Sequence, residues 1–115
     1  MKILNLTRKT IVAEDAKIAA SFCSRLVGLL NRTSLPQGEG LLLTRCRSIH
    51  MLFMRFPIDA IFVDKANTVV GLVRDLRPFG LSPFFGKAAF ALEVPARTIE
   101  KSQTQMGDTL AISSS

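Results

Sequence analysis

The sequence predicts a β-rich α+β domain: a small, twisted, barrel-like and mostly antiparallel sheet of about seven or eight strands, with one main helix packed on it. Three observations lead to this prediction. Short apolar runs bounded by turn residues recur along the chain, one stretch alone has helical periodicity, and no repeat or linker separates a second domain. We therefore expect one compact domain over residues 1–112 and a disordered tail at 113–115.

Each expected strand is a run of apolar residues between polar or turn-forming residues. These runs lie at residues 2–6, 10–13, 40–44, 49–53, 58–63, 68–73, 88–94 and 109–112. The stretch from Asp64 to Asn67 is expected to join 58–63 to 68–73 as a hairpin, because Asp and Asn stabilise tight turns. Pro57 separates 49–53 from 58–63, since proline donates no N–H to a sheet.

One main helix is expected at about residues 21–31. Its apolar positions recur with helical spacing: Ile18, Phe22, Leu26, Leu29 and Leu30. Ser21 is the expected N-cap, and the polar stretch 31–40 ends the helix. A helical turn is expected over 96–102, with Pro95 at or near its first position, where the missing N–H of proline leaves no bond unmade.

The chain carries 15 Lys and Arg against nine Asp and Glu, a net charge of +6. An excess of this size favours anionic partners. Basic residues gather in two stretches, Arg45, Arg47 and Arg55, then Arg74, Arg77 and Lys87. No block of five basic residues occurs, and Trp and Tyr are absent. We therefore do not expect nucleic acid to be the partner.

The first residues turn polar after three apolar positions, so they lack the apolar core of a signal peptide. No apolar run approaches the roughly 20 residues that span a bilayer. We expect a cytoplasmic monomer without a membrane span, or an exported protein if a leader has been removed. Cys23 and Cys46 lie in different expected elements, which favours reduced, structural thiols over a disulfide.

Several motifs occur in one order along most of the chain. They are Arg25 to Arg32, Gly40 to Leu43, Ile49 to Asp64, Leu92 to Ala96, and Gly107-Asp108. In these motifs, from about Ala20 to Ala111, the chain resembles a widespread bacterial and archaeal family catalogued as domain of unknown function 192. The resemblance implies a compact β-rich fold and no assigned activity.

Asp59 and Glu93 are carboxylates inside apolar runs, where an unpaired buried charge is costly. Asp59 must face solvent, pair with a cation or accept hydrogen bonds from backbone N–H groups. The available cations are Arg25, Arg55 and Arg77, so a structural ion pair and a ligand-binding or acid–base role both stay open. If Asp59 and Glu93 converge in one pocket, they could divide acid and base work between them.

His50 is the single histidine, and Cys46 precedes it by four residues. A zinc site needs four ligands, or three and a water, so we expect no metal. No glycine-rich phosphate loop and no nucleophile motif occurs either, and we expect no cofactor. His50 is therefore interpreted as a hydrogen-bonded structural residue, with a ligand contact or a proton acceptor as alternatives.

Residues 78–86 are rich in Gly and Pro, as is typical of a loop. This loop carries Phe79, Phe84 and Phe85. Exposed aromatic side chains there would mark a surface for a protein partner, and packing in the core is the alternative.

We interpret the protein as a non-enzymatic binding module. Its shallow basic pocket is expected near the 55–57 turn and the 78–86 loop, and would take a small anionic ligand or a peptide segment of a partner. The expected ligand-binding residues are Arg25, His50, Met54, Arg55, Asp59 and Arg77. The alternatives are a small enzyme that uses Asp59, Glu93 and His50, and a scaffolding subunit that docks through the 78–86 loop.

Overall fold

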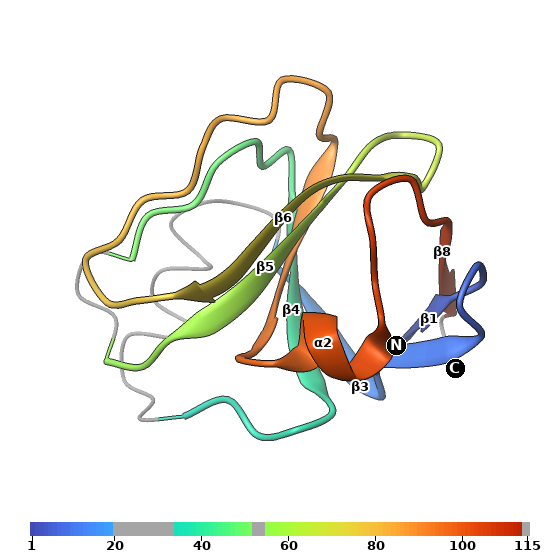
Figure 1. Ribbon diagram of the computed structural model, residues 1–115, viewed down its shortest axis with the longest axis horizontal. Coiled ribbons are helices and arrows are strands. Elements are labelled where there is room, and N and C mark those ends of the chain that lie inside the picture. The colour runs from blue at the N-terminus through green and yellow to red at the C-terminus, as the bar shows by residue number, and fades with distance from the viewer. Residues whose placement is uncertain (20–33, 52–54, 114–115) are drawn as a thin grey trace.

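The structure is a computed structural model that describes residues 1–19, 34–51 and 55–113. In these ranges the chain forms two sheets, with the short helix α2 beside them (Figure 1). The elements are β1 (Lys2–Asn5), β2 (Thr10–Ala13), β3 (Asp15–Ala19), β4 (Glu39–Thr44), β5 (Ile58–Val63), β6 (Val69–Leu76), β7 (Phe90–Pro95), α2 (Thr98–Ser102) and β8 (Leu110–Ser113). The strand order is β2-β1-β8 in one sheet and β3-β4-β7-β5-β6 in the other.

The pairing is antiparallel throughout both sheets except between β3 and β4, which are parallel. The predicted hairpin of β5 and β6 is confirmed. Its turn closes with a hydrogen bond from the Asn67 N–H to the Asp64 carbonyl at 3.0 Å. The Asp64 carboxylate accepts from the N–H groups of Ala66 and Thr68, each at 2.9 Å, which is the stabilising role expected of an aspartate at a turn.

Two neighbouring strands of the five-stranded sheet, β5 and β7, are buried on both faces. Every residue of β5 is buried, and its apolar residues divide between two different apolar clusters. Phe62 and Ala91 belong to one cluster, whereas Ile61 and Leu92 belong to the other. Because side chains alternate between the two faces of a strand, any polar side chain on the buried part of β5 or β7 must find its partners inside the protein.

The two sheets are joined at both ends by backbone hydrogen bonds. The amino group of Met1 donates to the Ala16 carbonyl at 3.1 Å, and the Ala16 N–H donates back to Met1 at 2.7 Å. At the other end, the Val69 N–H donates to the Asp108 carbonyl at 2.8 Å. The predicted β-rich α+β class is confirmed, but within the described ranges the barrel-like sheet takes the form of two bridged sheets that do not close into a barrel.

β3 is a strand that local sequence patterns do not predict. Ile18 fits the spacing of the expected helix, yet it is 61% exposed, whereas Ala16 of the same strand is buried. The strand is held by parallel pairing with β4 and by the bonds to Met1, which are long-range contacts that local periodicity does not report. The predicted helix at 21–31 lies outside the described residues.

Residues 49–51 do not form the predicted regular strand, and the rest of that run, 52–53, lies outside the described residues. Instead, they pair irregularly with the 78–86 loop. His50 forms an isolated bridge with Leu81, and the Met51 N–H donates to the Gly80 carbonyl at 2.8 Å. The loop is therefore tied to the centre of the chain by backbone hydrogen bonds.

The predicted helical turn is confirmed as α2, but its start is corrected. Pro95 is the last residue of β7, and the helix begins after Arg97, the N-cap residue, whose φ of 78° is left-handed. At the other end of the chain, β8 includes Ser113, the first residue of the expected tail, which pairs with Lys2.

A buried polar cluster fixes β1 against residues 104–108. The Asp108 carboxylate accepts from Asn5 Nδ2 at 3.0 Å, from Arg8 Nε at 3.1 Å and from the Gln105 N–H at 2.9 Å. Burial alone would raise the pKa of Asp108. The hydrogen bonds from Asn5, Arg8 and Gln105, with the charge of Arg8, nevertheless hold it below its ordinary value of 3.8.

Acidification should destabilise the fold through Asp108. Because the pKa of Asp108 is lower in the folded than in the unfolded protein, its stabilising contribution is full above about pH 4 and is lost as the pH falls further. The variant Asp108→Asn should be less stable than wild type at about pH 6, and the gap should narrow towards about pH 3. Urea unfolding at both pH values measures this, and a gap independent of pH would contradict the expectation.

Candidate functional site

Asp59 lies in β5 and is 1% exposed. Its carboxylate accepts two backbone hydrogen bonds of 2.9 Å, from the Ile99 N–H in the first turn of α2 and from the Asp75 N–H in β6. Arg97, the N-cap residue, makes no side-chain capping bond, so Asp59 supplies the acceptor from a distant strand. Of the three possibilities left open by the sequence, capping of backbone donors is the one observed, and no described Arg or Lys forms an ion pair with Asp59.

Glu93 lies in β7, next to β5, and is 2% exposed. The register pairs Asp59 with Val94 and Ala60 with Glu93. Directly paired residues share a face of the sheet and neighbours along a strand do not, so Asp59 and Glu93 point to opposite faces. The structure therefore does not bring together the two carboxylates of the hypothetical acid–base pair.

His50 is half-buried and lies on the stretch that pairs with the 78–86 loop. Cys46 donates from Sγ to the Ser48 carbonyl at 3.1 Å. In the part of the chain that the structure describes, no group of three His, Cys, Asp or Glu residues is placed to hold a metal ion.

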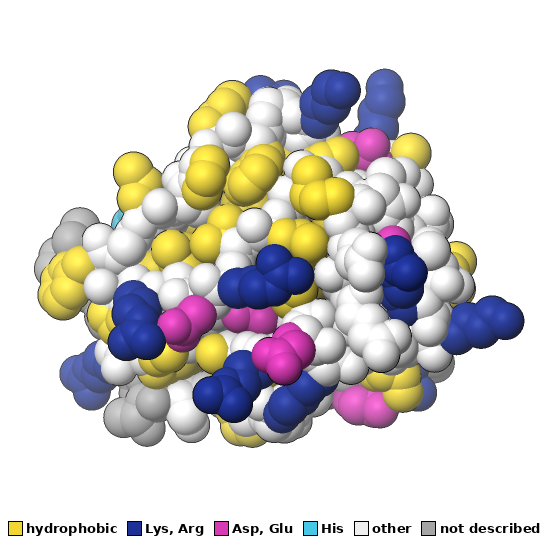
Figure 2. All heavy atoms as spheres, in the orientation of Figure 1, with side chains coloured by type: hydrophobic (Ala, Val, Ile, Leu, Met, Phe, Trp, Pro, Cys, Tyr) yellow, Lys and Arg dark blue, Asp and Glu magenta, His cyan; other side chains and the backbone are white. Residues whose placement is uncertain are grey.

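Asp59 and Arg77 are two predicted ligand residues that meet at one hollow, which we call the α2 hollow. It has a volume of about 580 Å³ and is lined by Pro57, Asp59, Arg74, Asp75, Arg77, Ala96, Arg97 and Glu100. Arg77 pairs with Asp75 at 3.0 Å. Cations and carboxylates are interleaved on this side of the molecule (Figure 2), so the three arginines of the α2 hollow face as many carboxylates.

The other predicted ligand residues do not join Asp59 and Arg77. Arg25 and Met54 lie outside the described residues. Arg55 is exposed, and neither Arg55 nor His50 lines the α2 hollow. Among the described residues, Asp59 and Arg77 are thus the two members of the predicted ligand set that line one hollow together.

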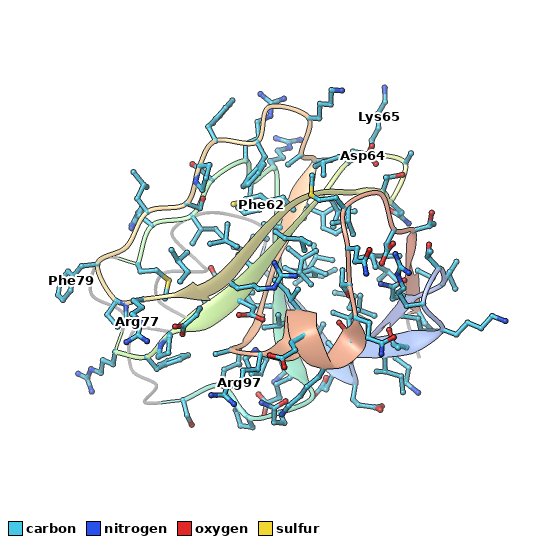
Figure 3. The ribbon with its side chains drawn as sticks, in the orientation of Figure 1. Phe62, Asp64, Lys65, Arg77, Phe79 and Arg97 are labelled. Carbon is cyan, nitrogen blue, oxygen red and sulfur yellow. The ribbon has the colours of Figure 1, made fainter. Side chains whose placement is uncertain are left out.

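The 78–86 loop exposes two of its three phenylalanines. Phe79 is 72% and Phe84 69% exposed, and Figure 3 shows Phe79 directed away from the molecule. Phe85 was expected on a partner surface together with Phe79 and Phe84. Instead its ring packs inward, with its centroid 4.5 Å from that of Phe62. Leu81, an apolar residue of the same loop that no sequence pattern marks, is 73% exposed.

A second site, which we call the basic furrow, consists of two adjoining hollows that share Arg47, Ala88 and Ala89. The larger, of about 650 Å³, is lined by residues 43–48, Phe84, Ala88 and Ala89. The smaller, of about 370 Å³, is lined by Arg47, Asp64, Lys65, Lys87, Ala88 and Ala89. Figure 3 shows Lys65, at the smaller hollow, near the top of the molecule and Arg97, at the α2 hollow, near the bottom, and the furrow shares no lining residue with the α2 hollow.

The basic furrow carries an excess of positive charge. Its cations, Arg45, Arg47, Lys65 and Lys87, are exposed, and none forms an ion pair with an acid among the described residues. Asp64 is the one carboxylate in the lining of the two hollows, and its Oδ1 already accepts two hydrogen bonds from the β5–β6 turn. The sequence showed Arg45, Arg47 and Lys87 as basic residues, but only the fold adds Lys65 to them.

Comparison with known proteins identifies the family. The sequence pattern described as "DUF192: Uncharacterized ACR" matches residues 3–112. The chain belongs to this family. The resemblance predicted from the motifs is thus confirmed, and the function of the DUF192 family is unknown.

Two curated relatives of this chain are named UPF0127 proteins. The protein of Thermococcus sibiricus is 32% identical over 112 residues, which cover 94% of this chain and 72% of the relative. The protein of Pyrococcus furiosus is also 32% identical, over 116 residues, which cover 94% of this chain and 95% of the relative.

Two crystal structures share the fold at 20% sequence identity. A protein of unknown function from Novosphingobium aromaticivorans has a TM-score of 0.81, with 96% of this chain and 82% of that chain covered. A protein from Sinorhizobium meliloti, described as a candidate transcription regulator, has a TM-score of 0.73, with 96% and 89% covered. These likenesses show that the fold is shared and nothing more. Among the described residues of this chain, no helix has the length and apolar character to cross a membrane.

Proposed function

We propose that this DUF192 protein is a non-catalytic binding module that takes an anionic ligand in the basic furrow. The observation that carries the proposal is the set of four exposed cations, Arg45, Arg47, Lys65 and Lys87, that line adjoining hollows without an acidic partner among the described residues. Clustered like charges raise the local potential, which attracts and concentrates anions.

The size of the furrow supports this proposal. Ligand pockets have volumes of about 300–1,000 Å³, and the larger hollow falls within that range. The α2 hollow is of similar size, but its arginines face carboxylates, so it offers an anion less net attraction. The enzymatic alternative is weakened because Asp59 and Glu93 face opposite sides of the sheet and Asp59 is occupied by two backbone donors.

The double variant Arg45→Gln/Arg47→Gln tests the proposal. Calorimetric titration with inorganic pyrophosphate and with hexaglutamate at low salt measures the affinity. The variant loses two solvent-exposed contacts between arginine and the anion. This loss should reduce the binding free energy by about 1–2 kcal/mol, which is roughly a five- to thirtyfold rise in Kd. Affinity should also fall steeply as salt is added, because the contacts are exposed.

The matched control is Arg74→Gln/Arg97→Gln in the α2 hollow, which removes the same net charge from a hollow that shares no lining residue with the furrow. This control should change Kd by less than about twofold. Equal losses in the two double variants would mean that net charge, not the furrow, holds the anion. If neither pyrophosphate nor hexaglutamate binds to the protein, the proposed function is refuted.

A further inference from the structure

Phe84 is an exposed aromatic ring on the wall of the basic furrow. It is 69% exposed and lines the larger hollow together with Arg45 and Arg47. A large apolar side chain beside cations is unusual for a site that takes only a small, fully hydrated anion, since the ring gains little from such a ligand. The ring therefore points to a ligand with an apolar part.

The outward direction of Phe84 is fixed by its neighbour. Phe85 packs on Phe62 and over Gly71, and its N–H donates to the Arg47 carbonyl at 2.8 Å. Two residues before Phe84, Ser82 is buried and its Oγ accepts from the Ile49 N–H at 2.8 Å. Because the chain is anchored on both sides of it, the backbone at Phe84 loses little conformational entropy when a ligand packs on the ring.

The arrangement of the cations indicates an extended ligand. Arg45 and Phe84 line the larger hollow, Lys65 and Lys87 line the smaller one, and Arg47 lies in both. Charges spread along a furrow suit a chain with several anionic groups, whereas a single phosphate would be held by donors that converge on one point.

We infer that the basic furrow binds an extended acidic peptide segment of a protein partner. Carboxylates of the segment would contact Arg45, Arg47, Lys65 and Lys87, and one bulky apolar side chain would pack on Phe84. This inference rests on the proposed function and names the partner class of the same site. Single-stranded nucleic acid fits less well, because Phe84 is the one aromatic ring in the lining of the two hollows and the Asp64 carboxylate stands beside Lys65.

The test uses two peptides of eight residues with the same acidic sequence, one with a central Phe and the other with Ala at that position. Each is titrated into the full chain and into the variants Phe84→Ala and Phe79→Ala. The Phe peptide should bind wild type about three- to tenfold more tightly than the Ala peptide, the range expected for one aromatic pair. This preference should vanish in Phe84→Ala and persist in Phe79→Ala, which removes an equally exposed ring of the same loop outside the furrow.

The outcomes separate this inference from the proposed function. If both peptides bind equally, and Arg45→Gln/Arg47→Gln weakens both, the anion site stands and the inference fails. A preference for the Phe peptide that survives in Phe84→Ala also overturns it, as does tighter binding of oligothymidylate with the same number of charges. If neither peptide binds, and pyrophosphate does not bind either, both proposals fail. Thermal melts of the variants confirm that each is folded.

Discussion

Replacing Asp59 with alanine should lower the free energy of unfolding by about 3 kcal/mol and the Tm by about 10–15 °C. The carboxylate accepts the N–H groups of Ile99 and Asp75, and its removal leaves the Ile99 donor unsatisfied in a buried position at the start of α2. Asp59→Asn should cost roughly half as much, because the amide keeps one acceptor oxygen of similar position but turns an NH2 group towards the other donor. Thermal or urea unfolding measures both changes.

The control for this prediction is Asp75→Asn. The Asp75 carboxylate is half exposed and pairs with an exposed guanidinium, so its loss should change stability by less than about 0.5 kcal/mol. An Asp59→Ala variant that melts within about 2 °C of wild type would contradict the capping role. An Asp59→Asn variant with unchanged Tm and lost ligand binding would instead assign the carboxylate to a binding site.

Replacing Gly71 with alanine should destabilise the protein by about 2–3 kcal/mol, as expected for an overpacked site. A Cβ atom on Gly71 would lie 2.5 Å from Cδ1 and Cε1 of Phe85, closer than real atoms approach. The ring of Phe85 would have to leave its place on Phe62. Because Phe85 also anchors the loop beside Phe84, Gly71→Ala should weaken the binding of the Phe peptide as well.

A double-mutant cycle checks the cause of this loss. With Phe85→Leu in the background, the smaller side chain gives room to the new methyl group, so the effect of Gly71→Ala should shrink by about 1 kcal/mol or more. Gly86→Ala is the matched glycine control. A Cβ atom there meets the ring of Phe84 at an ordinary 3.6 Å, so the variant should unfold like wild type. Full additivity of Gly71→Ala and Phe85→Leu would show that the two residues do not clash.

Much of the fold could be predicted from the sequence because most strands are locally encoded. The runs at 2–6, 10–13, 40–44, 58–63 and 68–73 match β1, β2, β4, β5 and β6, each to within a few residues. Apolar residues bounded by turn residues are sufficient to specify a strand when it lies in a buried sheet. β3 could not be predicted in this way, because its strand conformation depends on pairing with β4 and on hydrogen bonds to Met1. In addition, its exposed Ile18 has the sequence spacing of an apolar residue in the expected helix.

The basic character of the candidate site could be predicted from the sequence, but the set of residues that line it could not. The excess of Lys and Arg and the clustering of Arg45 and Arg47 are visible in the sequence. That Lys65 and Lys87 join them depends on the β5–β6 turn and the loop before β7 meeting at one furrow. Phe84 and Phe85 look alike in sequence, and the space above Gly71 is what turns Phe85 inward and leaves Phe84 outside.

By itself, the sequence determined the β-rich class, the hairpin of β5 and β6, the family and the basic character of the surface. These follow from composition, from local apolar patterns and from motifs that each lie within one stretch of the chain. The tertiary structure alone decided which polar side chains meet. Asp59 and Glu93 lie in neighbouring strands, and a shift of one residue in the register of β5 against β7 would place them on the same face. Register is set by the packing of whole faces, not by the residues near either carboxylate, so it could be seen only in the folded sheet.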